Sequence, residues 1–395
     1  MKSINIRNFK IILMNIILFL YQFEFIGGGD TGITLSVFRL GIMPLLFVLL
    51  LLQRNKAFAI DPKDTPAILV ILFFFVSYAI SSLQLAPPPF TSIFGCLLQF
   101  WTAYIFFREF GIQKSSLWVL TTWSLFQLPY FLIAISTGEV GLSHRFMGFH
   151  WDPNYLCMTV TISFWAAIYL LRLETSKFRR LFLLGLAIAS VLMVLFSLSR
   201  GGLFCLILTS LLYLFFNNKK VLIVLGALSF SLFSYMIARA QYITWDADLS
   251  LLDSIIYRNF VIAEDGDISS GRLDFISTFL TMIGNGEGIV YGKTLPKFIN
   301  DLNGGEFPHN ALIEVILHSG LIAGGIFFLL FLKKIATITL ASLRNRSLPF
   351  ELLMIITTIL VMMFLSWGLK FCWLIVGLTF AISNKSVFKN HYSKI

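Results

Sequence analysis

Long apolar runs recur along the whole chain and are separated by short polar segments. An α-helix needs roughly 20 predominantly apolar residues to cross the hydrocarbon core of a bilayer. The pattern predicts about twelve such helices, at residues 9–26, 33–52, 66–85, 91–107, 116–136, 153–171, 181–198, 201–216, 221–238, 309–332, 349–366 and 370–384. We therefore expect an all-α, multi-pass membrane protein.

Composition and charge agree with this expectation. The chain is 57% hydrophobic and 13% charged, which excludes an ordinary soluble globular domain. Most lysine and arginine residues fall on alternate connections between the predicted helices, and cytoplasmic connections are the ones enriched in these residues. Both termini are therefore predicted to be cytoplasmic. The formal net charge of +10 follows from this orientation, so no nucleic-acid partner is expected.

One connection, residues 239–308, is far longer than the others and lies on the predicted outer side. It contains 10 of the 20 acidic residues of the chain. Because loops of this length rarely lack structure of their own, we expect short helices near 255–260 and 273–283, lying at the membrane mouth. The chain then divides into nine helices within 1–238, this large loop, and three helices within 309–395.

Four arginines lie on the predicted outer side of the chain: Arg39 within a membrane helix near its outer end, Arg200 at the tip of a tight outer hairpin, and Arg145 and Arg272 in outer loops. A charge close to the hydrocarbon is costly, so such an arginine suggests a function. The guanidinium fork matches phosphate oxygens, and the four could converge on one diphosphate. The alternative is that each arginine reaches lipid headgroups or pairs with a carboxylate.

The segment around His309 lies where the acidic loop meets an apolar helix. An imidazole at such a boundary can accept a proton near neutral pH, which makes His309 a candidate base. Asn310 is a favourable N-cap, and Glu314 could orient or balance a charge nearby. The alternative is that His309 merely caps or packs at the start of this helix.

Neither a metal nor another cofactor is expected. The four cysteines all fall inside apolar runs and show no metal-ligand or disulfide spacing. Asp246 and Asp248 form a D-x-D pattern, but it lies in a generally acidic loop that favours a solvated surface.

Four segments, taken in order, resemble the O-antigen polymerase and O-antigen ligase superfamily of bacterial membrane glycosyltransferases. They are R-F-M-G-F-H-W-D-P-N at 145–154, S-L-S-R-G-G at 197–202, S-G-R-L at 270–273, and P-H-N-A-L followed by G-L-I at 308–322. The resemblance covers residues from about 140 to 330. Ala311, Ile313 and Ala323 depart from the usual pattern, which bears on packing more than on chemistry.

The resemblance implies a GT-C-like glycosyltransferase in the bacterial inner membrane, with its active site facing the periplasm. Donor and acceptor would be undecaprenyl-diphosphate-linked oligosaccharides within the membrane lipid, and a chain-length regulator protein is a further conceivable partner. His309 would match the proposed base, while Arg200 and Arg272 would match the arginines that hold the diphosphate. Arg145 is a less close match.

We favour the polymerase, which transfers a growing glycan to the non-reducing end of a new lipid-linked repeat unit. The ligase, which transfers the finished glycan to lipid A-core, would use the same residues. A lipid-linked oligosaccharide flippase belongs to another class, for which we would expect internal repeats and charges spread through the helices. A scaffold in a polysaccharide assembly complex is a further alternative, in which the arginines would be dispensable.

Overall fold

The computed structural model describes much of the chain at the level of individual residues. The described residues are 5–23, 37–53, 60, 62, 64–85, 90–138, 145–148, 150, 152–217, 220, 223, 231, 234–236, 238–243, 250–257, 272–292, 310–362 and 370–382. They form helices and the turns between them, and no strand occurs in these ranges. The predicted all-α architecture is therefore confirmed.

The helices follow one another with short connections over most of the chain. Their bounds are α1 (Ile6–Tyr21), the π-helix η1 (Val37–Ile42), α3 (Met43–Leu52), α5 (Thr65–Ser82), α6 (Phe90–Phe110), α7 (Lys114–Ser136), α8 (Pro153–Leu173), α9 (Lys177–Phe196), α10 (Arg200–Asn217), α12 (Leu251–Ile256), α13 (Arg272–Gly284), α15 (Ala311–Ser319), α16 (Leu321–Asn345), α17 (Phe350–Met362) and α18 (Lys370–Ala381). Within the described ranges, α5, α7, α8, α9, α10 and α16 are long and apolar enough to cross a membrane. The chain is thus a polytopic membrane protein.

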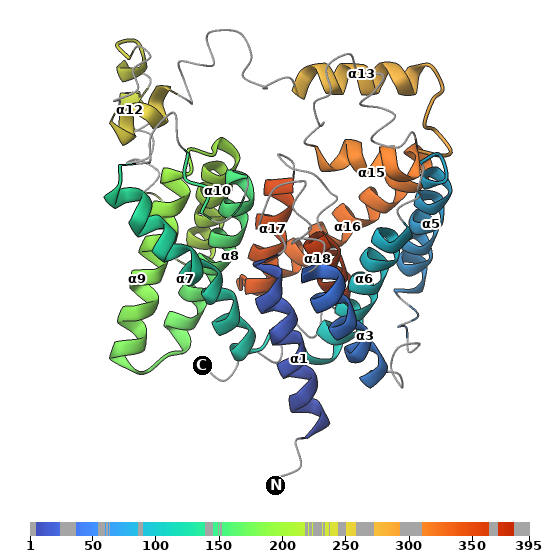
Figure 1. The fold of residues 1–395 in the computed structure, drawn as a ribbon, viewed down its shortest axis with the longest axis horizontal. Helices are drawn as coiled ribbons and strands as arrows, with labels where there is room; N and C mark the ends of the chain where they lie inside the picture. The colour runs from blue at the N-terminus through green and yellow to red at the C-terminus, as the bar shows by residue number, and fades with distance from the viewer. Residues whose placement is uncertain are drawn as a thin grey trace.

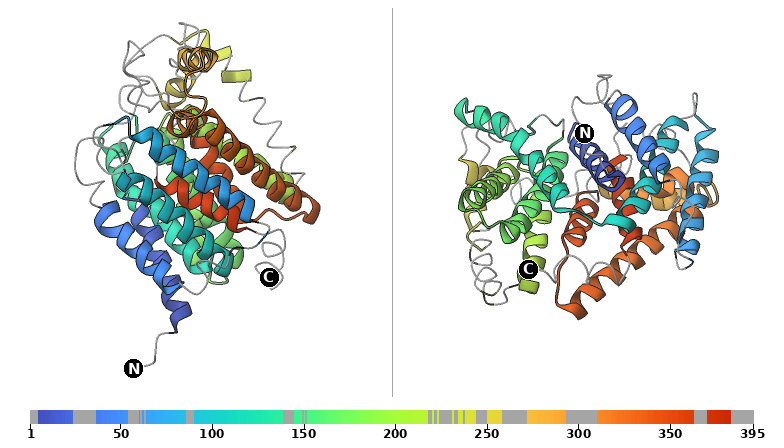
Figure 2. Two further views of the ribbon diagram at one scale, coloured as in Figure 1. Left: turned by 90° about the vertical axis from the view of Figure 1, so that its right-hand side faces the viewer. Right: turned by 90° about the horizontal axis from the view of Figure 1, so that it is seen from below.

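Two groups of helices stand side by side (Figure 1). One group contains α7, α8, α9 and α10, and the other contains α3, α5, α6, α15 and α16, with α17 and α18 between them. The short helices α12 and α13 lie across one end of the molecule, which we call the α13 end, and α1 begins at the opposite end (Figures 1 and 2). This arrangement places the two short loop helices on one side of the bundle.

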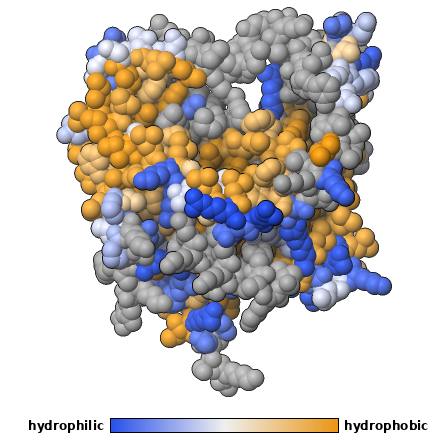
Figure 3. All heavy atoms as spheres, turned by 180° about the vertical axis from the view of Figure 1, so that it is seen from behind, coloured by the Kyte–Doolittle hydropathy of each residue, from blue (hydrophilic) through white to orange (hydrophobic). Residues whose placement is uncertain are grey.

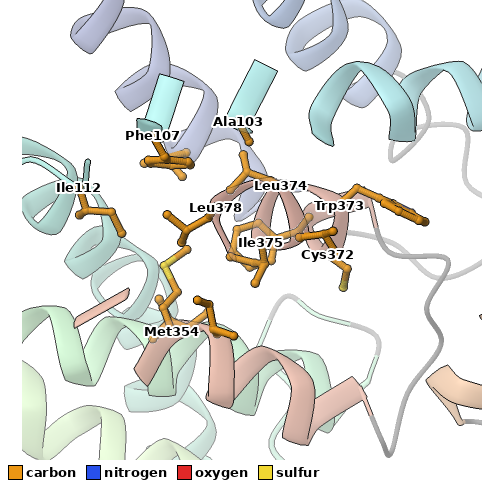
Figure 4. Close-up of a cluster of buried hydrophobic side chains, with 14 of the residues drawn as sticks. Ala103, Phe107, Ile112, Met354, Cys372, Trp373, Leu374, Ile375 and Leu378 are labelled. Atoms are coloured by element: carbon orange, nitrogen blue, oxygen red, sulfur yellow. The ribbon is translucent and has the colours of Figure 1, made fainter. Parts of the chain in front are cut away.

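The helix α18 forms the centre of the main hydrophobic core. Every side chain from Phe371 to Ile382 is buried, as expected of a helix that is apolar all round. Figure 4 shows its side chains between two neighbours, with Leu374 and Leu378 toward α6 and Met354 of α17 on the other side. A Cβ atom at Gly377 would meet the α6 backbone, so the glycine permits this close packing.

The outer surface of the bundle is largely apolar. Figure 3 shows a broad hydrophobic region on the face turned away in Figure 1, bordered below by hydrophilic side chains. The helix α16 runs along this side of the molecule, opposite α1 and α3 (Figure 2). An exposed apolar belt with a polar border is the surface that a lipid bilayer covers.

The structure divides the predicted helix 309–332 in two. The helix α15 ends at Ser319, and Gly320 has φ +86°, a left-handed conformation that breaks the helix before α16 begins. The helix α16 then continues to Asn345, well beyond the predicted end at 332. Hydropathy placed Lys333 and Lys334 in a connection between helices, whereas in the structure both residues lie inside α16.

The two short helices expected in the long loop are present, but only one of them has the predicted bounds. The helix α13 matches the prediction for 273–283 almost residue for residue. The helix α12, in contrast, ends at Ile256 and overlaps only the start of the predicted 255–260. It begins earlier because the Ser250 side chain accepts a hydrogen bond from the Asp253 backbone N–H and caps the helix there.

Candidate functional site

Two segments that carry candidate arginines meet at the α13 end of the α7–α10 group. The Phe146 N–H donates to the Phe196 carbonyl oxygen at 3.2 Å, and Arg145 Nε donates to the Ser197 carbonyl oxygen at 3.1 Å. The segment before α8 is thereby held against the turn between α9 and α10. Two of the sequence motifs, about 50 residues apart in the chain, are neighbours in space.

Side-chain hydrogen bonds fix the turn between α9 and α10. The Ser197 hydroxyl accepts from the Ser199 N–H at 3.2 Å, and the Ser199 hydroxyl accepts from the Gly202 N–H at 3.0 Å. Leu198, between the two serines, has φ +50°, which is unusual for a residue with a branched side chain. The turn therefore holds a strained but well-bonded conformation directly before Arg200, the first residue of α10.

The first turns of α8 and α10 pack closely against each other. The Ser199 hydroxyl donates to Asn154 Oδ1 at 2.5 Å, and Asn154 lies in the first turn of α8. A Cβ atom at Gly202 would overlap the Cys157 side chain, so only glycine allows this approach. Cys157 Sγ also lies 3.0 Å from Ser197 Oγ. These contacts make the position of Arg200 dependent on α8.

Arg145 lies close enough to Arg200 and to the Asp152 carboxylate to interact electrostatically with both. Burial lowers the pKa of Arg145, Asp152 counteracts this effect, and the nearby Arg200 lowers the pKa further. Arginine remains protonated in proteins, so two neighbouring guanidinium groups favour binding of an anion. The N-terminus of α10, which begins at Arg200, adds its partial positive charge.

His150 supports this region without titrating near neutral pH. It is buried, its Nε2 lies 3.2 Å from the Thr159 hydroxyl, and burial lowers its pKa to about 3. Asp152 caps α8, because its side chain accepts from the Asn154 N–H at 2.6 Å. Both residues therefore stabilise the entry to α8, and neither is a candidate base.

A second group of candidate residues lies at the start of α15. Asn310 Oδ1 accepts from the Ile313 N–H at 3.3 Å, which confirms Asn310 as the helix cap. Glu314 is fully buried and interacts electrostatically with Tyr78 of α5. The His318 ring packs against the Tyr78 ring with centroids 4.4 Å apart. Glu314 thus faces the interior between α15 and α5.

The remaining candidates are placed only in part. His309 lies outside the described residues, and so do Asp246 and Asp248. The backbones of Arg39 and Arg272 belong to η1 and α13, but their side chains are outside the description. Two side chains of the helix that begins at Arg272, Phe279 and Met282, cluster with Ile313 and Leu317 of α15.

Sequence reasoning missed the residues that hold the arginines in place. Cys157, Ser197 and Ser199 were not candidates, although the Gly201-Gly202 pair signals a close approach of some partner. All four cysteines are buried, and none of them forms a disulfide. Among the described residues, no group of three or more His, Cys, Asp or Glu side chains could hold a metal ion.

No model of a known protein family matches the chain, and no curated protein matches it. A function must therefore be inferred from the residues and their geometry. The surroundings of Arg145 and Arg200 are the most informative about function, because two guanidinium groups, a helix N-terminus and a hydrogen-bonded turn lie together there.

Proposed function

We propose that this chain is a membrane glycosyltransferase of the O-antigen polymerase kind. One observation carries the proposal: the loop before α8 and the turn before α10 bring Arg145 and Arg200 together at a helix N-terminus. Such a region suits the diphosphate of a lipid-linked sugar donor. The resemblance of the same two segments to the superfamily supplies the reaction type.

In the proposed reaction, an acceptor hydroxyl attacks the anomeric carbon of the donor glycan. The sugar–phosphate bond breaks, and undecaprenyl diphosphate leaves with growing negative charge. Arg145 and Arg200 would stabilise that charge, together with Arg272 and Arg39 from their own segments. His309 would take the proton of the hydroxyl, a role that rests on the resemblance and on its position directly before the capped start of α15.

The architecture proposed for this function is a GT-C-like bundle of about twelve membrane helices in a bacterial inner membrane. The α13 end would face the periplasm, so that α12, α13 and both groups of candidate residues lie on that side. The basic residues of the predicted cytoplasmic connections support this orientation. Glu314 would act as a buried positioning group for the start of α15.

The test is the length distribution of surface polysaccharide in a strain that lacks the protein. Complementation with the wild-type chain should restore a ladder of chain lengths, whereas His309→Ala and Arg200→Ala should leave a single repeat unit on lipid A-core. Arg346→Ala is the matched control, because Arg346 follows α16 on a predicted cytoplasmic connection and should restore the normal ladder.

Other outcomes would identify other functions. Bare core with long chains accumulated on undecaprenyl diphosphate would indicate the ligase. Repeat units retained on the cytoplasmic side would indicate a flippase. A normal ladder from both His309→Ala and Arg200→Ala, at matched protein levels, would overturn the glycosyltransferase proposal and favour a scaffold.

A further inference from the structure

The segment after α13 is fastened to the ends of two membrane helices. The Leu321 N–H donates to the Gly288 carbonyl oxygen at 2.9 Å, and the Ile322 N–H donates to the Ile289 carbonyl oxygen at 3.1 Å. The Gly292 N–H donates to Ser81 Oγ at 2.8 Å. Residues 288–292, which we call the clip, therefore join the end of α5 to the start of α16.

Close backbone packing holds the clip at the break between α15 and α16. A Cβ atom at Gly320 would meet the Val290 carbonyl, and a Cβ atom at Gly292 would meet the Leu317 carbonyl. Gln84 Nε2 also donates to the Gly292 carbonyl oxygen at 3.2 Å. Contacts with Gly320, Leu317 and Gln84 thus fix the position of the clip relative to the membrane helices.

Although its backbone is well fixed, the clip exposes apolar side chains. Ile289, Val290 and Tyr291 are 36%, 53% and 52% exposed. The turn just before them, residues 285–287, is polar and also exposed. A rigid segment that places three consecutive apolar side chains outward, next to a polar turn, marks a surface with an apolar partner.

The exposed side chains of the clip continue the exposed apolar surface of α16. On α16, Ile322, Ile326 and Leu329 are exposed at helical spacing and begin where Ile289 is bonded. On α5, in contrast, the clip is bonded to Ser81, which is fully buried and faces away from the exposed Val76 and Ile80. The clip therefore lies at the end of the exposed apolar stripe of α16 that is nearer to α13.

We propose that the clip is a lipid-binding element that inserts Ile289, Val290 and Tyr291 into the boundary between acyl chains and headgroups of the adjacent leaflet. Tyr291 suits this depth, because its ring is apolar and its hydroxyl reaches the hydrated headgroups. The polar turn at 285–287 would remain in water. Lipid is favoured over a protein partner because the exposed apolar stripe on α16 begins at Ile322, which is bonded to the clip.

Insertion would also fix the position of α13. Phe279 and Met282 pack on α15, and the chain passes from this helix directly into the clip. With one face on α15 and its end anchored in lipid, α13 would lie parallel to the membrane surface, as it does relative to the bundle in Figure 1. This inference does not depend on the proposed catalytic function.

Site-directed spin labelling of the full chain, with one copy in each lipid nanodisc of phosphatidylethanolamine and phosphatidylglycerol, tests the proposal. A nitroxide on Val290→Cys should be more accessible to oxygen than to a polar nickel complex. Glu287→Cys, three residues earlier on the polar turn, should show the reverse. Leu329→Cys, on the exposed face of α16, is the benchmark for lipid contact. Labelling should be selective, because the four native cysteines are buried.

Two results would overturn the proposal. If the Val290 label is as accessible to the nickel complex as the Glu287 label, the clip lies in water. If it is shielded from both reagents while Leu329 remains accessible to oxygen, protein covers the clip. The measurement reports collisions of the label with small reagents, so neither result depends on enzymatic activity. The lipid-binding proposal therefore holds or fails independently of the glycosyltransferase proposal.

Discussion

The contact between Gly202 of α10 and Cys157 of α8 gives the sharpest prediction for the candidate site. Replacing Gly202 by alanine adds one methyl group that would overlap both Sγ and Cβ of Cys157. Both residues lie inside helices, so the overlap can be relieved only by moving α10 against α8. Such a movement would displace the turn that holds Arg145 and Arg200.

The expected magnitude follows from two opposing effects. Overpacking by a methyl group typically costs about 1–3 kcal/mol. Alanine is itself better than glycine in a helix by roughly 0.5–1 kcal/mol. Gly202→Ala should therefore destabilise the protein by about 1–2 kcal/mol. In a Cys157→Gly background both overlapping atoms are gone, so the same substitution should be neutral or slightly stabilising.

A double-mutant cycle in detergent micelles measures this difference. The free energy of unfolding by sodium dodecyl sulfate would be compared among the wild type, the two single variants and the double variant. Gly185→Ala is the matched control, because a Cβ atom there meets nothing within 4 Å. If the effect of Gly202→Ala is the same in both backgrounds to within about 0.5 kcal/mol, the proposed contact between α8 and α10 is wrong.

Three further predictions concern other parts of the chain. Arg200→Lys should shorten the polysaccharide ladder and lower its amount by about tenfold or more at unchanged protein level, because lysine lacks the planar fork; an unchanged ladder would argue against an anion site. Gly320→Ala should destabilise the protein by roughly 1–3 kcal/mol in the same unfolding titration, since φ is +86° and the Val290 carbonyl occupies the space; Gly325→Ala, which has open space, should not. Lys114, bonded to Glu174 at 2.6 Å, is the main cause of the lowered pKa of Glu174, and Arg179 adds to it. The resulting stability should be complete above the ordinary glutamate pKa of about 4.3 and lost as the pH falls through the lower folded value. Melting temperatures between pH 3 and 6 should show this loss, and Lys114→Met should reduce it; equal pH dependence in both proteins would contradict the ion pair.

Local sequence signals predicted the helices best where hydropathy and capping agree. The predicted spans 153–171, 181–198 and 201–216 correspond closely to α8, α9 and α10. Asp152 and Pro153 mark the start of α8 in the sequence as clearly as in the structure. Hydropathy alone placed the end of the predicted 309–332 helix too early, because α16 continues to Asn345 after its most apolar stretch has ended.

The candidate arginines were also recognisable from the sequence, and their convergence was expected, but the contacts that bring two of them together were not. A charge at an apolar boundary is a local property, so Arg145 and Arg200 stood out as single residues. Their proximity depends on the Arg145–Ser197 and Ser199–Asn154 hydrogen bonds, which join segments about 50 residues apart. Neither hydropathy nor spacing along one helix contains that information.

The sequence by itself determined that this is a multi-helix membrane protein, where most helices begin and end, and which charges stand at their boundaries. Those properties follow from transfer of side chains between water and lipid, residue by residue. The tertiary structure decided which boundaries meet, that Glu314 points into the bundle, and that the clip lies on the break at Gly320. Helices in lipid gain little hydrophobic energy by associating, so their partners are chosen by close packing and interhelical hydrogen bonds. Only the folded chain brings those groups together.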